Sequence, residues 1–253
     1  MTTAGSVESA ARRAIRELKA NARPPGTFDA SRYFRTTESL RFLNVGTPVV
    51  RALGKAIARD RRDTWTVGDA LAFADILIAD PHLEIKGVGI ETLACFRRQF
   101  TPALLGTCKR WLATNRSANW ATTDSICGSL IGPLLLRHPE LVPVVKRWAA
   151  HRNMWVRRAA AVSLVRLAAR GLALDDVYDV AVALRPDGHD LIHKAAGWLL
   201  REAGKTDPVR LERHLVAHGP AIPRTTLRYA IERFPAAKRR ELLAATRPAR
   251  TAR

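Results

Sequence analysis

The chain has 253 residues, 47% of them hydrophobic, so it can bury a core as one large domain or two small ones. This composition argues against a disordered chain. Lysine and arginine number 42 against 23 acidic residues, and the formal net charge of +19 favours a polyanionic partner such as nucleic acid. An arginine-rich and alanine-rich composition also arises from genomic base bias, so charge alone leaves that alternative open.

The N-terminal stretch MTTAGSVESAARRAIREL has no apolar core of the signal-peptide type. The longest apolar runs, such as SLIGPLLL at residues 129–136, are too short to span a bilayer. We therefore expect a cytoplasmic protein that does not contact membranes. Three cysteines, Cys95, Cys108 and Cys127, lack C-x-x-C spacing and are odd in number, so we interpret them as buried thiols rather than as zinc ligands or disulfides.

Apolar residues recur at helical spacing along the chain, as in AAAVSLVRLAARG at residues 159–171, and alternating strand-like runs are absent. The sequence therefore predicts an all-α fold. Proline and glycine mark the places where helices must stop or start. These are Pro81, Pro102, Pro139, Asp187-Gly188, Asp207-Pro208 and Gly219-Pro220.

The stretch NWATTD at residues 119–124 places Trp120 and Asp124 four residues apart, and therefore on one face of the expected helix. Most helical aspartates are merely solvated and most tryptophans belong to the core, so the pair alone is a weak signal. In a chain with so large an excess of positive charge, an acid and an indole on one face nevertheless indicate a candidate site.

The later helices repeat. The stretch MWVRRAAAVSLVR (154–166) aligns with DLIHKAAGWLLRE (190–202) at a shift of 36 residues, and RTTLRYAIERF (224–234) follows at a shift of 34. Backwards along the chain, Trp155 aligns with Trp120 at a shift of 35. A helical period in the mid-thirties is typical of solenoids built from paired helices, which offer a concave surface.

In this register Arg158, Lys194 and Arg228 occupy one repeat position, which predicts a column of cations suited to a phosphate backbone. The alternative is a solvated polar face. Trp155 and Trp198 lie in the same repeats, and aromatic faces stack on bases or sugars. Asp124 is an acidic residue that interrupts this column of cations, so we expect the candidate catalytic site there.

Two histidine pairs, His189 with His193 and His214 with His218, have the i, i+4 spacing that can chelate zinc. The zinc-protease pattern requires glutamate directly after the first histidine, where this chain has Asp190. We therefore expect neither a metal site nor any other cofactor. Residues 1–240 are predicted to form a single domain, followed by a basic, flexible tail at residues 241–253.

Taken together, FLNVGTPVVRAL near residue 42, NWATTDSI, RHPELV, NMWVRRAA and KAAGWLLREAGKTDP resemble the HEAT-like-repeat DNA alkylation repair enzymes, the AlkD type of DNA glycosylase. The resemblance covers roughly residues 33 to 235. It implies an all-helical solenoid that holds duplex DNA in a basic concave cleft, excises N3- and N7-alkylated purines and does not rotate the base out of the helix.

The resemblance also implies roles for individual residues. Asp124 matches the catalytic aspartate of the family, and Trp120 and Trp198 match two aromatic residues that pack against the sugar-phosphate backbone of the damaged strand. Arg158 matches an arginine of the same cleft. Where the family commonly has a second aromatic residue and a further acid, this chain has Asn119 and Ala121, which bears on the range of substrates.

We therefore expect a monomeric, monofunctional glycosylase of base excision repair that acts on duplex DNA containing alkylated purines, bulky adducts included. A non-catalytic relative that binds duplex or branched DNA through the same groove is the main alternative. A helical scaffold for an acidic protein is a third, but it leaves NWATTD unexplained. Lyase activity stays open, because a lysine such as Lys194 could form a Schiff base.

Overall fold

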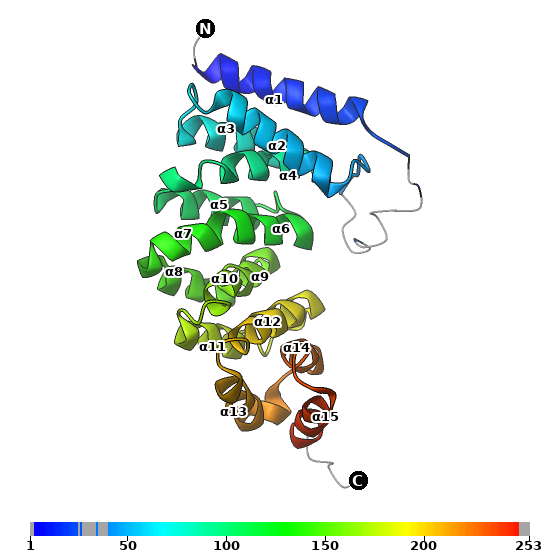
Figure 1. Ribbon diagram of the computed structural model, residues 1–253, viewed down its shortest axis with the longest axis vertical. Helices are drawn as coiled ribbons and strands as arrows, with labels where there is room; N and C mark the ends of the chain where they lie inside the picture. The colour runs from blue at the N-terminus through cyan, green and yellow to red at the C-terminus, as the bar shows by residue number, and fades with distance from the viewer. Residues whose placement is uncertain (1–2, 25, 27–33, 35–39, 248–253) are drawn as a thin grey trace. The chain divides into compact units, whose positions relative to one another are not determined.

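The computed structural model describes residues 3–24, 26, 34 and 40–247, and within these ranges every regular element is helical. Figure 1 shows the helices in chain order. The first seven are α1 (Thr3–Ala20), α2 (Thr47–Arg61), α3 (Val67–Ile78), α4 (Leu83–Ala94), α5 (Ala103–Ala113), α6 (Trp120–Ile126) and α7 (Gly132–Arg137). The others are α8 (Val142–Lys146), α9 (Met154–Val162), α10 (Val165–Ala168), α11 (Leu174–Ala183), α12 (Asp190–Ala203), α13 (Pro208–His218), α14 (Arg224–Ala230) and α15 (Ala236–Ala245).

Short tighter or wider helical turns join these elements. They are the 3₁₀ turns η2 (Arg97–Gln99), η4 (Pro139–Leu141), η5 (Arg147–Ala150) and η6 (Gly219–Ala221), and the π-helix η3 (Cys127–Ile131). An isolated parallel bridge between Arg41 and His82 ties the segment before α2 to the start of α4. The all-α prediction is therefore confirmed for the part of the chain that the structure describes.

The chain forms two compact units, Met1–Leu134 and Leu135–Arg253. In the first unit, α4 packs against α2, α3 and α6, and α1 packs against α3 and α4. Gly87 and Gly54 allow α2 and α4 to come close: a Cβ at Gly87 would lie 2.9 Å from Val50 Cγ1, and one at Gly54 would lie 2.8 Å from Glu91 Cβ. A larger residue at either position would push the two helices apart.

In the second unit, α12 packs between α9 and α14, and also against α11. These three helices, α9, α12 and α14, contain the stretches that the sequence aligns at shifts of 36 and 34 residues. The predicted repeat is thus a real stack of helices in which each repeat packs on the next, as in a HEAT-like solenoid. At the α12–α14 contact a Cβ at Gly197 would lie 2.5 Å from Tyr229 Cβ, so only glycine fits there.

The apolar spacing of α12 shows why the repeats stack. Its buried residues recur every three or four positions, which places them on one stripe of the helix. They include Ile192, Ala195, Ala196, Leu199, Leu200 and Ala203. Small alanines in this stripe let neighbouring helices approach closely, and the same holds for the fully buried Ala159, Ala160 and Ala161 of α9.

The expected helix breaks are confirmed. Asp207 caps α13 by accepting a hydrogen bond from Arg210 N at 2.8 Å, and Pro208 fills the first position, where no N–H is needed. Pro102 precedes α5, Pro139 begins η4, and Gly219-Pro220 begins η6. The positions of proline and glycine in the sequence therefore predict correctly where these helices begin.

Two sequence-based expectations change. Cys95 is exposed at the end of α4, whereas Cys108 and Cys127 are buried, so only two of the three cysteines are buried thiols. Of the tail expected at residues 241–253, residues 241–245 belong to α15 and Leu242 is buried, while residues 248–253 lie outside the described ranges. The single domain over residues 1–240 stays a prediction. No described helix is long and apolar enough to cross a membrane.

Candidate nucleic-acid interface

Asn119 builds the start of the helix that contains Trp120 and Asp124. Its side-chain oxygen accepts a hydrogen bond from Thr122 N at 2.8 Å, and its amide donates to Ser117 O at 2.6 Å and Thr122 Oγ1 at 2.9 Å. This bond from Thr122 N makes Asn119 the N-cap of α6, and the side chain is fully buried. The asparagine at this position therefore has a structural role.

The two sides of α6 differ in exposure. Thr122, Thr123 and Ile126 are buried, whereas Trp120 and Asp124 are partly exposed. The i, i+4 spacing therefore places the indole and the carboxylate together on the accessible side of the helix, as the sequence predicts. Both side chains take part in further interactions within the protein.

Phe34 adds an aromatic ring that the sequence did not suggest. Its ring stacks on the indole of Trp120 with centroids 5.0 Å apart and an interplanar angle of 10°, and it also contacts Phe42 at 5.4 Å. Because Phe34 is 8% exposed, it supports one face of Trp120 and leaves the rest of the indole partly accessible.

The helix widens one residue after the end of α6, three residues beyond Asp124. Residues Cys127–Ile131 form a single π-helical turn, in which Gly132 N donates to Cys127 O. Pro133 follows in the first turn of α7, and because proline has no backbone N–H it donates no hydrogen bond to the preceding turn. Such bulges are frequent at functional sites.

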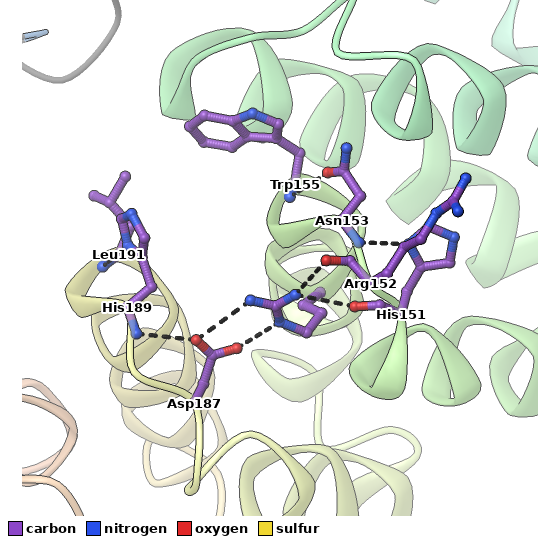
Figure 2. Close-up of polar contacts among 8 residues, drawn as sticks. His151, Arg152, Asn153, Trp155, Asp187, His189 and Leu191 are labelled. Atoms are coloured by element: carbon purple, nitrogen blue, oxygen red, sulfur yellow. Dashed lines mark hydrogen bonds and ion pairs between the residues drawn. The ribbon is translucent and has the colours of Figure 1, made fainter.

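In the second unit, an ion pair ties together the segments that begin α9 and α12 (Figure 2). Arg157 Nε donates to Asp187 Oδ2 at 2.5 Å, while Arg157 Nη1 donates to the carbonyl oxygens of His151 and Arg152 at 3.0 and 2.9 Å. Asp187 Oδ1 in turn accepts from His189 N at 2.9 Å. Burial alone would raise the pKa of Asp187, but the hydrogen bonds from Arg157 and His189 N–H lower it overall, so the carboxyl stays ionised.

The same two segments cap their helices. Asn153 Oδ1 accepts from Trp155 N at 2.8 Å, and His189 Nδ1 accepts from Leu191 N at 3.2 Å. Trp155 is partly exposed in the first turn of α9 (Figure 2). His189 is therefore engaged in capping α12, which gives this histidine a structural role.

Arg158, Lys194 and Arg228 lie on the neighbouring helices α9, α12 and α14, but their surroundings differ. Arg158 is only 5% exposed, and its Nη1 donates to Leu191 O at 2.5 Å. Lys194 is partly exposed and pairs with Asp190 at 2.8 Å. Arg228 is exposed in the last turn of α14. The three are therefore neighbours in the repeat without being equivalent, and their common contact with a phosphate backbone stays a prediction.

The environment of Lys194 fixes its protonation state. The hydrogen bond to Asp190 raises the pKa of Lys194, and this outweighs the opposing effects of burial and of the nearby Arg158 cation. The hydrogen bond from Lys194 lowers the pKa of Asp190 in turn. Lys194 is therefore a firmly protonated amine beside an ionised carboxylate.

The tryptophans separate into two groups. Of the six in the chain, Trp65, Trp111 and Trp148 are buried in the core, whereas Trp120, Trp155 and Trp198 are partly exposed. The partly exposed group consists of the three indoles that the sequence singled out as candidates: Trp120 and Trp155 share a repeat position, and Trp198 lies in the following repeat. Trp120 belongs to the first unit, and Trp155 and Trp198 belong to the second.

The second histidine pair forms an aromatic cluster. The rings of His214 and Tyr178 have centroids 4.8 Å apart, and the rings of His214 and His218 also have centroids 4.8 Å apart. Burial, together with electrostatic repulsion from His218, Arg185 and Arg210, lowers the pKa of His214 to about 4. Among the described residues no group of three or more histidine, cysteine, aspartate or glutamate side chains could hold a metal ion.

Comparison with known proteins identifies relatives of this architecture. The family model described as DNA alkylation repair enzyme matches residues 14–234. A solved structure of a predicted DNA alkylation repair enzyme from Enterococcus faecalis is similar, with a TM-score of 0.68 and 20% identity over 82% of this chain and 94% of that one. Curated proteins gave no match.

Proposed function

This chain belongs to the family of DNA alkylation repair enzymes, and from that premise we propose that it is a monofunctional DNA glycosylase. Its reaction would be hydrolysis of the N-glycosidic bond of N3- and N7-alkylated purines in duplex DNA. The observation that carries this proposal is the position of Asp124, a carboxylate on the accessible side of α6 beside Trp120 in a chain with a net charge of +19.

The proposed chemistry follows from the charge of the lesion. Alkylation at N3 or N7 makes the purine cationic, so it leaves without being protonated by a general acid. The sugar then develops oxocarbenium character, which a fixed carboxylate stabilises electrostatically. Asp124 would provide this charge and hold the water that attacks the sugar, and no metal or cofactor would be required.

The remaining candidates would position the DNA. Trp120 and Trp198 would pack against the sugar-phosphate backbone of the damaged strand, and Arg158, Lys194 and Arg228 would neutralise flanking phosphates. Recognition through the backbone would not require the base to leave the helix, in contrast to glycosylases that rotate it into a pocket.

The state of Lys194 supports a monofunctional enzyme. A lyase reaction through a Schiff base needs a neutral amine as the nucleophile. The ion pair with Asp190 raises the pKa of Lys194 and keeps the amine protonated, which disfavours that route. Water, activated at Asp124, is therefore the proposed nucleophile.

The test is incubation of the protein with a duplex that contains a single 7-methylguanine, with an identical undamaged duplex as control. Formation of an abasic site in the damaged duplex alone, without strand cleavage, is the expected result. Binding of both duplexes without any abasic site would favour the non-catalytic DNA-binding alternative. Failure to bind either duplex would favour a scaffold for an acidic protein.

A further inference from the structure

A cavity of about 400 Å³ lies inside the first unit, between α2, α4 and α6. Its walls are mainly apolar and include Val50 from α2, Ile90 from α4, and Trp120 and Ala121 from α6. This volume falls within the range of small-molecule sites in proteins. The proposed glycosylase reaction makes no use of the cavity, although Trp120 belongs to both.

One wall of the cavity contains a stacked pair of aromatic rings. Phe34 and Trp120 both line it, and their rings are nearly parallel, with an interplanar angle of 10°. An aromatic pair of this kind favours a planar ligand, because a third ring can continue the stack.

A second wall presents a buried carboxylate. Glu84 lines the cavity and is 8% exposed, and its oxygens accept hydrogen bonds from Leu43 N at 3.0 Å and Asn44 N at 2.8 Å. In the part of the chain that the structure describes, no lysine, arginine or histidine forms an ion pair with Glu84. A carboxylate offers about four acceptor positions, and two backbone N–H groups donate to Glu84, so its oxygens have capacity for a further N–H donor.

By contrast, the other acid of the cavity is already paired. Glu91 forms an ion pair with Arg51 at 3.5 Å, and both residues line the same cavity. The carboxylate that remains for a ligand is therefore Glu84, in the same cavity as the stacked rings of Phe34 and Trp120.

We propose that this cavity binds the free alkylated purine, stacked along Trp120 and donating its N–H groups to Glu84. The ligand is planar and apolar on its faces and carries amino or ring N–H donors on its edge, which are the features that proteins use to hold unstacked bases. The choice of ligand rests on the proposed function, since the free purine is the product of that reaction. Binding of the product beside Trp120 makes it an inhibitor of the next turnover.

The binding test uses the full-length protein without DNA. Equilibrium dialysis measures how much radiolabelled 3-methyladenine the protein binds. Saturable binding is expected for the wild-type protein. Val50→Phe places a larger side chain in the cavity from α2, and we expect it to weaken binding at least tenfold. The matched control is Val49→Phe on the same helix, because Val49 is 47% exposed and does not line the cavity. It should bind like the wild-type protein.

Ala121→Leu fills the cavity from a half-buried position on α6 and is measured in parallel, with thermal melting as the check on folding for each variant. Glu84→Gln removes the carboxylate charge and should also weaken binding. The proposal is overturned if the wild-type protein shows no saturable binding at millimolar 3-methyladenine, or if neither folded filling variant weakens it. Excision of 7-methylguanine is scored separately: excision without binding overturns this inference alone, and binding without excision contradicts only the proposed function.

Discussion

The indole of Trp120 lies parallel to the ring of Phe34, with centroids 5.0 Å apart, while Trp111, nine residues earlier in the chain, is completely buried. Trp120 is therefore a candidate for a role at the surface, whereas Trp111 belongs to the core. Trp111 also donates its Nε1 hydrogen to Asp75 at 2.6 Å. The contrast provides a matched test of the proposed interface.

Trp120→Ala should slow excision of 7-methylguanine at least tenfold and leave the fold intact, because the indole is partly exposed. Trp111→Ala is the control and should destabilise the protein by about 3–5 kcal/mol, as large core truncations do. Single-turnover excision and thermal melting measure the two effects. Unfolding of the Trp120→Ala variant would assign that indole to the core, and the same reasoning applies to Trp198→Ala.

Asp124→Asn keeps the size of the side chain and removes its charge. Excision should fall roughly 10²- to 10³-fold, the order observed when one preorganised electrostatic group is lost. Affinity for undamaged duplex should stay the same or increase, because a like-charge conflict with phosphate is relieved. Asp63→Asn, at an exposed position after α2, is the control and should excise normally. Wild-type excision by Asp124→Asn would remove Asp124 from the mechanism, and equal losses of excision and binding would make it a structural residue.

Affinity for undamaged duplex should fall steeply with salt, because each neutralised phosphate contributes a log-log slope of roughly −0.9. Arg228→Gln removes one exposed cation of the repeat register and should reduce the magnitude of the slope by about one. Fluorescence anisotropy at several salt concentrations measures both. A flat response in the wild-type protein would argue against binding through phosphates, and an unchanged slope in Arg228→Gln would remove this residue from the contact.

His214 makes the free energy of unfolding depend on pH. Its pKa is about 4 in the folded state and near 6.5 when unfolded, so between these values the unfolded chain binds the extra proton. Stability should therefore fall as pH decreases from about 6.5 to about 4, by at most about 1.4 kcal/mol per pH unit and less after solvent screening. His214→Phe should flatten this part of the profile, and His138→Phe, outside the cluster, should not. Urea unfolding across this range measures the profile, and an unaltered slope in His214→Phe would contradict the assignment.

Much of the fold follows from the sequence because helical repeats are local. The spacing of small and apolar residues predicts α9, α12 and α14 and their order of packing, and proline and glycine predict the helix ends. Trp120 and Trp155 occupy one repeat position and are both partly exposed, in agreement with the register. These features depend on one helix and its neighbours, which a periodic pattern encodes.

Other features depend on contacts that no periodicity encodes. Phe34 lies outside any helix, so nothing in the sequence links it to Trp120. Arg158 shares a register position with the exposed Arg228 yet is buried, because its side chain turns to the carbonyl of Leu191. Cys95 follows the last residue of a largely buried helix but points outward. Each outcome is decided by side-chain direction, which composition and spacing leave open.

The ion pair between Arg157 and Asp187 has a kinetic consequence. It holds the loops before α9 and α12 through four hydrogen bonds to Asp187 and to the carbonyls of His151 and Arg152. A ligand that approaches the starts of these helices meets a surface that was ordered during folding, so little conformational entropy is lost on association. We therefore expect diffusion and electrostatic steering, rather than loop rearrangement, to set the encounter rate of a ligand that binds this surface.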